Sequence, residues 1–156
     1  MAKKYRGRKR PPIQEVLSYD FPSLVENFSR RFKLPKRECI EIFTETKKWL
    51  WLANEFEFDR AVSAVNIEEL PLFPHLLIID EMWHSFILFT VPYSEFCNSF
   101  FGAYIHHHPN LSPESSKRKT SKLLAWFVDY VSDKLGEATA VKWLNYYPVR
   151  YAKLLA

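Results

Sequence analysis

The residues best suited to chemistry lie in residues 78–109, which read IIDEMWHSFILFTVPYSEFCNSFFGAYIHHHP. Asp80 and His84 are four positions apart in an apolar run, so a helix places both on one face. Burying such polar groups without partners costs several kcal/mol for each. We expect their partners to be each other, Cys97, the histidine run 106–108 or a bound metal.

The spacing and types of these residues predict a metal site. Asp80 and His84 can direct both side chains at one ion, as histidines do in the i, i+4 zinc motif. A third ligand from His107, or alternatively His106, gives two imidazoles and a carboxylate, a set that suits Fe(II), Mn(II) or Zn(II) with open coordination positions. With Cys97 as a fourth ligand the set becomes typical of a closed zinc site. The cofactor we predict is Zn(II) or Fe(II), and the alternative is that no cofactor is bound.

Two other interpretations of the same residues stay open. An Asp80–His84 pair can serve only to tie a helix to a loop, and a thiol in an aromatic-rich helix is usually core. Cys97 as a catalytic nucleophile is disfavoured, because neighbouring phenylalanines raise the pKa of a buried thiol. The histidine run can also be a surface feature with one member facing inward.

Length and composition predict one folded domain. A chain of 156 residues can bury a large core, and the 47% hydrophobic content argues against disorder. The three glycines form neither a phosphate-binding loop nor a dinucleotide-binding motif. The two cysteines lie apart from each other and form no C-x-x-C pair, so we expect reduced thiols.

The basic charge is concentrated at the N-terminus. Residues 1–12 hold six of the 22 Lys and Arg residues and no acid, so the remainder carries 16 basic and 18 acidic residues. We predict a flexible basic tail at 1–12 and a helical domain at 13–156. The tail can contact a protein or nucleic-acid partner, or only improve solubility. No apolar run is long enough to span a bilayer and no signal sequence is evident, so we expect a cytoplasmic protein.

Helical periodicity and Pro or Gly boundaries predict an all-α domain of about six or seven helices. The run from Pro74 is apolar on nearly every side and predicts a central, largely buried helix. Asp20 and Thr90 are expected helix caps. The expected helices start at Pro22, Pro35, Pro74 and Thr90, followed by an irregular segment 104–109, a polar connection 110–120 and helices 121–135, 138–145 and 151–155; a further short helix is allowed in 59–72.

The motif cluster resembles the bacterial branch of the proteins named glycine-rich domain-containing-like. The shared pattern is an aspartate followed by Trp-His, then a tyrosine and a cysteine, which here reads DEMWH at 80–84, Tyr93 and Cys97, with His107 as a later element. The likeness is concentrated in residues 78–109. It implies a shared cluster of motifs and no particular reaction.

Two features of this chain depart from that resemblance. Plant members commonly carry a second histidine where this chain has Phe86, and the glycine-rich region is absent. Within the cluster, Trp83 and Tyr93 are expected to support the ligands without binding the metal themselves.

Three hypotheses follow from the sequence. The first is a small intracellular helical protein whose buried Asp/His cluster, with or without Cys97, binds a divalent transition metal, with a metal-dependent enzyme as one form of it. The second is a non-catalytic adaptor that uses the basic tail and an aromatic surface to hold a protein or nucleic-acid partner. The third is a metal-free cluster that serves only as a structural staple.

Overall fold

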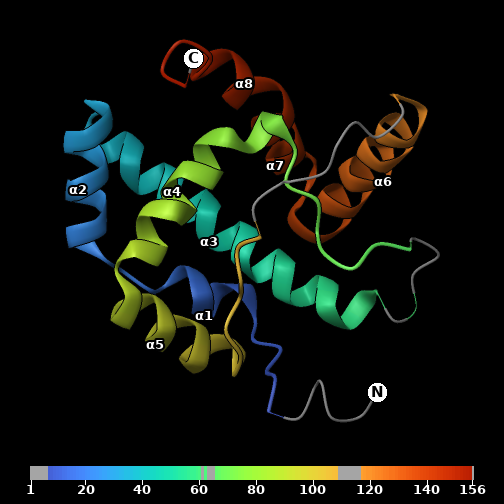
Figure 1. Ribbon diagram of the computed structural model, residues 1–156, viewed down its shortest axis with the longest axis horizontal. Coiled ribbons are helices and arrows are strands. Elements are labelled where there is room, and N and C mark those ends of the chain that lie inside the picture. The colour runs from blue at the N-terminus through green and yellow to red at the C-terminus, as the bar shows by residue number, and fades with distance from the viewer. Residues whose placement is uncertain (1–6, 61, 63–65, 109–116, 156) are drawn as a thin grey trace.

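A computed structural model describes residues 7–60, 62, 66–108 and 117–155 (Figure 1). Within these ranges the chain is helical and contains no strand, which confirms the predicted all-α class. No helix in this part is long and apolar enough to cross a membrane. The elements in chain order are α1 (Ile13–Leu17), α2 (Pro22–Phe32), α3 (Lys36–Asp59), the 3-10 turn η1 (Pro74–Leu76), α4 (Leu77–Leu88), α5 (Thr90–Phe101), α6 (Lys117–Leu135), α7 (Glu137–Val141), the π-helical turn η2 (Lys142–Tyr146) and α8 (Tyr147–Arg150).

Helix α3 is the centre of the domain, and α1, α2, α4 and α6 all pack against it (Figure 1). It is 24 residues long and buries side chains along its whole length, from Ile42 through Leu50 to Phe56. Burial of large apolar and aromatic side chains is the main term that stabilises such a helix. The prediction that the helix after Pro35 is largely covered therefore holds.

Helix α4 carries the apolar run that starts at Pro74, and it packs on α3. Met82, Trp83 and Phe86 are buried, whereas Leu88 is mostly exposed. One face of α4 therefore lies in the core and a narrow strip of it faces solvent.

Helix α5 follows α4 after a sharp turn and ends at Gly102, as expected from the sequence. Gly102 has φ of 64°, a left-handed conformation that glycine adopts without a Cβ penalty. Residues 103–108 then form the irregular segment that the sequence predicts before Pro109. This segment carries the histidine run 106–108 back towards α4.

The prediction that Asp20 and Thr90 cap α2 and α5 with their side chains is wrong. The N-cap positions are Phe21 and Phe89, and neither helix has a side-chain cap hydrogen bond. A proline in the first turn, such as Pro22, has no backbone N–H. Fewer N–H groups in that turn therefore lack a hydrogen-bond acceptor, and the need for a side-chain cap is smaller.

The C-terminal elements also differ from the sequence prediction. Helix α6 starts at Lys117 rather than at 121, and Pro148 lies inside α8 rather than separating two helices. The π-helical turn η2 directly precedes α8. Proline has no backbone N–H, so it cannot pair with a carbonyl of the preceding turn. The wider π-helical turn accommodates the proline at this point. The helix expected at 151–155 is a turn. Most of the connection at 110–120 lies outside the described residues, as do 61 and 63–65 of the short helix allowed in 59–72.

Half of the predicted tail lies on the domain surface. Pro11 accepts a hydrogen bond from Trp51 Nε1 on α3 at 2.9 Å, and Arg8, Lys9 and Arg10 contact α3 and α5. Residues 1–6 lie outside the described part of the chain.

Candidate metal centre

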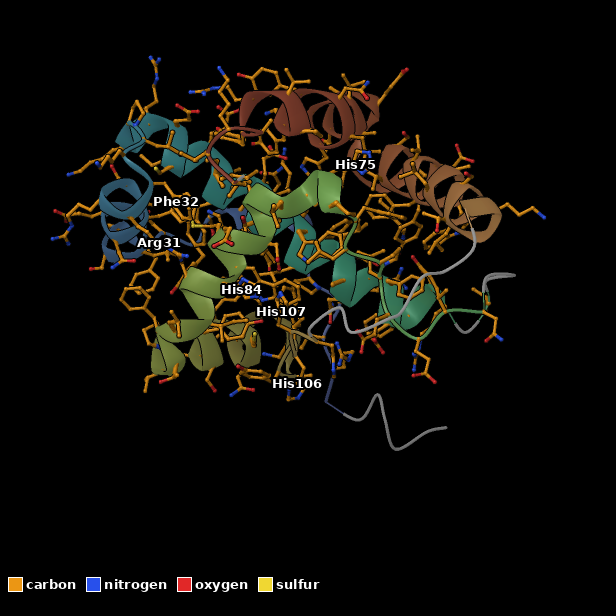
Figure 2. All side chains as sticks on the ribbon, turned by 45° about the horizontal axis from the view of Figure 1, so that its top comes forward. Arg31, Phe32, His75, His84, His106 and His107 are labelled. Atoms are coloured by element: carbon orange, nitrogen blue, oxygen red, sulfur yellow. The ribbon has the colours of Figure 1, made fainter. Side chains whose placement is uncertain are left out.

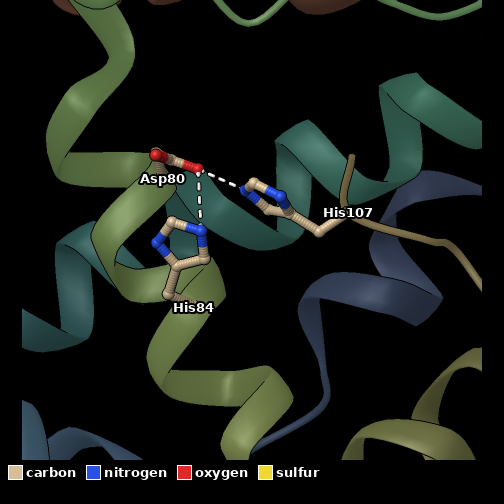
Figure 3. A group of neighbouring side chains, drawn as sticks. All are labelled: Asp80, His84 and His107. Carbon is tan, nitrogen blue, oxygen red and sulfur yellow. Dashed lines mark hydrogen bonds and ion pairs between the residues drawn. The ribbon is translucent and has the colours of Figure 1, made fainter. Parts of the chain in front are cut away.

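Asp80, His84 and His107 converge on one point of the surface (Figure 3). One carboxylate oxygen and one ring nitrogen from each histidine all lie within 4.8 Å of one another. Asp80 Oδ1 is 2.5 Å from His107 Nε2 and 3.7 Å from His84 Nε2. The centroids of the two imidazole rings are 4.2 Å apart. Both ring nitrogens therefore face the same carboxylate oxygen.

The helix α4 and the irregular segment after α5 supply the three side chains. Asp80 and His84 are one turn apart on α4, which places them on the same face as the sequence spacing predicts. His107 comes from the segment that follows Gly102 and runs back beside α4. The reversal of the chain at the two ends of α5 is therefore what assembles the cluster.

A chain of two hydrogen bonds positions the segment that carries His107. Trp83 Nε1 donates to the Tyr93 hydroxyl at 2.9 Å, and that hydroxyl donates to the backbone carbonyl of Ile105 at 2.6 Å. The Trp83 ring also packs on the His107 ring, with centroids 4.3 Å apart. Trp83 and Tyr93, expected from the sequence to support the cluster, thus contact the residue and the segment they would have to hold.

The cluster lies at the surface rather than in the core, which corrects the expectation of a buried site. The side chains of Asp80 and His107 are 16% and 13% exposed, but that of His84 is 46% exposed. The cause is the position of α4, whose outer strip is not covered by another described helix. Solvent therefore reaches one side of the cluster directly.

The distances are close to those of a coordinated ion. Zinc binds nitrogen and oxygen ligands at about 2.0–2.2 Å, so two ligand atoms of a tetrahedral site lie about 3.4 Å apart. The observed separations of Asp80 Oδ1 from the two ring nitrogens, 2.5 and 3.7 Å, fall on either side of that value. Shifts of about 1 Å or less would bring each of these two pairs to the separation found in a tetrahedral site.

Cys97 is placed apart from this group. It is fully buried on α5 and is not among the residues whose ligand atoms converge in the described part of the chain. Burial raises the pKa of the thiol, although contacts with the Ile105 backbone and the Tyr93 side chain act in the opposite direction. A buried thiol with a raised pKa is a poor nucleophile, in agreement with the sequence argument.

The neighbours of His107 point elsewhere. His106 is exposed and its ring lies beside the Tyr104 ring, 4.7 Å between centroids. His108 Nε2 is 3.1 Å from a carboxylate oxygen of Glu69, and both side chains are more than half exposed. Figure 2 shows His84 and His107 together and His106 apart from them. Among the three histidines of the run, His107 is thus the one that meets Asp80.

One contact of α4 was not predicted from the sequence. Arg31, at the end of α2 (Figure 2), lies 3.2 Å from Glu81 and 3.5 Å from the hydroxyl of the buried Ser85, each one position along α4 from a residue of the cluster. It comes from another helix, so no local pattern could place it there. The contact joins α2 to α4.

A separate hollow of about 300 Å³ lies between η1 and the C-terminal turn. It is mostly apolar, with Leu77, Tyr147 and Leu155 among its lining residues. None of the three residues of the cluster lines it. The cluster of Asp80, His84 and His107 is therefore a convergence of side chains at the surface and not the floor of this pocket.

The fold and the cluster together define a small all-α domain with a surface group of two histidines and one aspartate. Residues 14–142 match the UCP032817-like family, so the chain belongs to that family. The matched range contains Asp80, His84 and His107. Neither the curated proteins nor the solved structures yield a match to this chain.

The family match corrects the resemblance to the glycine-rich domain-containing-like proteins, which is wrong. That resemblance was concentrated in residues 78–109, whereas the family match extends over most of the chain. A short pattern of aspartate, Trp-His, tyrosine and cysteine is therefore not specific to one family. The description of the matched family names no activity.

Proposed function

We propose that this protein binds one divalent transition-metal ion through Asp80, His84 and His107. The observation that carries the proposal is the convergence of three ligand atoms, from a helix and from a distant segment, within 4.8 Å of one another. Imidazole nitrogen and carboxylate oxygen are ligands of Zn(II) and Fe(II). We propose that the bound ion is one of these two.

The exposure of His84 supports an open site. Three protein ligands leave at least one coordination position of a tetrahedral ion, and more of an octahedral one, for another group. The half-exposed side of the cluster gives water or a substrate oxygen access to that position. A metal there would lower the pKa of bound water or polarise a bound oxygen, which is the chemistry of metal-dependent enzymes.

A structural staple explains the geometry less completely. The pair Asp80–His107 is close enough for a hydrogen bond, and it alone would tie α4 to the segment after α5. His84 adds no hydrogen bond at 3.7 Å, yet its Nε2 is oriented towards the same oxygen (Figure 3). A shared ion gives all three side chains a role.

The structure lends less support to an adaptor that works through the basic tail. Arg8, Lys9 and Arg10 already bind groups of their own domain through hydrogen bonds and ion pairs. A partner that used these three residues would have to displace those contacts. The adaptor therefore remains the alternative, and the metal site is the function we favour.

The test is a metal titration of protein purified without a nickel column and treated with a chelator. We expect Zn(II) to bind with a stoichiometry of one in a competition assay with a zinc-sensitive dye. His84→Ala should lower the affinity more than 100-fold, since supporting residues alone are worth about 10- to 100-fold. Anaerobic titration with Fe(II) then compares the two ions.

The matched control is His108→Ala, which removes an exposed imidazole of the same histidine run. His108 pairs with Glu69 and not with Asp80, so its loss should leave the affinity unchanged. No stoichiometric binding to the wild type, or an equal loss in both variants, would exclude the proposed site.

A further inference from the structure

We propose that residues Gly7–Arg10 form a strap that holds the C-terminal end of α5 and so positions His107 for the metal. This inference rests on the proposed function, because it assigns these residues a role at the same site. The strap lies far from His107 in sequence, and its link to the site is the short segment 103–108.

The first part of the strap binds the end of α5 directly. The backbone N–H of Lys9 donates to the Phe101 carbonyl at 2.7 Å, and Lys9 Nζ donates to the Ser99 carbonyl at 3.2 Å. The last carbonyls of a helix lack intrahelical partners, so these bonds satisfy groups that would otherwise need water or a cap. The strap thus serves as the cap of α5.

Gly7 of the strap also packs closely against Gly102 at the end of α5. A Cβ atom at Gly102 would overlap the Gly7 carbonyl oxygen. Two features therefore favour glycine at position 102. Its backbone is left-handed, and the strap lies where a side chain would be. No side chain fits at this position while the strap is seated.

The second part of the strap is anchored on α3. Asn54, which is almost fully buried, accepts a hydrogen bond from Arg8 at 2.8 Å and donates one to the Lys9 carbonyl at 2.9 Å. Arg10 then binds Glu55 at 2.6 Å and Asp59 at 2.9 Å. The strap therefore joins the central helix to the end of α5.

The position of the strap bears directly on His107. The segment that carries His107 leaves α5 at Gly102, where the strap is seated, and its backbone is held again at Ile105 by the Tyr93 hydroxyl, before the His107 ring meets Asp80. With its start released, the segment would hinge about Ile105 and the His107 ring would lose its fixed distance to Asp80. Preorganised ligands bind an ion more tightly than mobile ones, because less conformational entropy is lost on binding.

The sharpest test compares Gly102→Ala with Gly136→Ala. Both glycines have positive φ, 64° and 94°, so alanine strains the backbone at either position. A Cβ at Gly136 meets no atom within 4 Å, whereas at Gly102 it would displace the strap. We expect Gly102→Ala to lower the Zn(II) affinity at least tenfold and Gly136→Ala to leave it unchanged.

A thiol probe reports on the strap without any metal. In a Cys39→Ala background, the buried Cys97 is the remaining thiol, and it lies under the segment at Ile105. Displacement of the strap should raise the rate at which Cys97 reacts with a disulfide reagent at least tenfold. Asn54→Leu removes the two bonds that Asn54 makes with Arg8 and Lys9 and keeps a similar side-chain volume, so it should have the same effect as Gly102→Ala.

The outcomes separate this inference from the proposed function. If the wild type binds no ion but Gly102→Ala exposes Cys97, the strap is real and the metal role fails. If the wild type binds Zn(II) and both strap variants bind it equally well, the positioning role is wrong. Loss of the whole fold in Gly102→Ala and Asn54→Leu, with Gly136→Ala folded, would also contradict it, because the strap would then support the entire domain.

Discussion

Asp59 and Asp80 are both partly exposed carboxylates with several partners, but their partners differ in kind. Asp59 binds Arg10, Lys134 and the Tyr130 hydroxyl through both of its oxygens, at 2.8–2.9 Å. Asp80 presents one oxygen to two imidazoles. Protonated arginine and lysine have no lone pair to offer a metal, whereas a neutral imidazole has one.

The comparison shows that partner chemistry, and not charge density, distinguishes a candidate ligand set from a structural ion network. In the network around Asp59, the charges balance: Arg10 and Lys134 both bind Asp59, and both also bind Glu55. It ties the strap and α6 to α3. The cluster around Asp80 keeps a side open to solvent, as a site with exchangeable ligands requires.

The largest expected effect is on metal binding, which should depend on Asp80. Asp80→Asn keeps the side-chain shape but removes the charge, so we expect the Zn(II) affinity to fall more than 100-fold, beyond the range of supporting residues. Competition titration measures the change. Glu81→Gln, which alters the neighbouring carboxylate that binds Arg31, is the control and should bind as the wild type does.

The converse variant, Asp59→Asn, should affect stability instead. It removes a charge that accepts hydrogen bonds from three side chains, and we expect a loss of about 2 kcal/mol in the free energy of unfolding, typical of charged hydrogen bonds at a partly buried site. Urea denaturation measures it. An unchanged midpoint, or a loss of metal affinity as large as that of Asp80→Asn, would mean that the two regions do not divide the roles as proposed.

A smaller effect is expected for Tyr93→Phe. The change removes the hydroxyl that joins Trp83 to the Ile105 carbonyl, while the ring stays in place. We expect the Zn(II) affinity to fall about tenfold, the size of effect usual for residues that orient ligands. If only stability changes and the affinity does not, Tyr93 packs the core without positioning His107.

The network around Asp59 should also show a pH dependence. Burial opposes ionisation, but hydrogen bonds from Lys134, Tyr130 and Arg10 outweigh it and lower the pKa of Asp59 below its ordinary value of 3.8. A lowered pKa in the folded state means stability that is complete above 3.8 and is lost as the pH falls through the folded value. The difference in unfolding free energy between wild type and Asp59→Asn should therefore shrink from pH 7 to about pH 3. A difference that grows with acid would contradict this.

The smallest effect is expected at His106, the alternative ligand considered from the sequence. Its side chain is exposed beside Tyr104 and is not part of the convergent group in the described residues. His106→Ala should therefore leave the Zn(II) affinity within twofold of the wild type, about 0.4 kcal/mol or less. A large loss would show that His106 replaces His107 when the ion binds.

The sequence alone determined the features that depend on local geometry. The spacing of Asp80 and His84 places both on one face of a helix because an α-helix repeats every 3.6 residues. Gly102 ends α5 because glycine adopts a left-handed conformation that other residues resist. The all-α class follows from the same periodicity, read over the whole chain.

Only the tertiary structure decided which groups meet and how far solvent reaches them. Nothing local distinguishes His106, His107 and His108; the packing of His107 on Trp83 and the bond from Tyr93 to Ile105 do. The exposure of His84 depends on which helices cover α4. The packing of Gly7 against Gly102 brings together residues that are far apart in the chain. Such contacts arise from packing between elements, and a one-dimensional pattern carries no information on that packing.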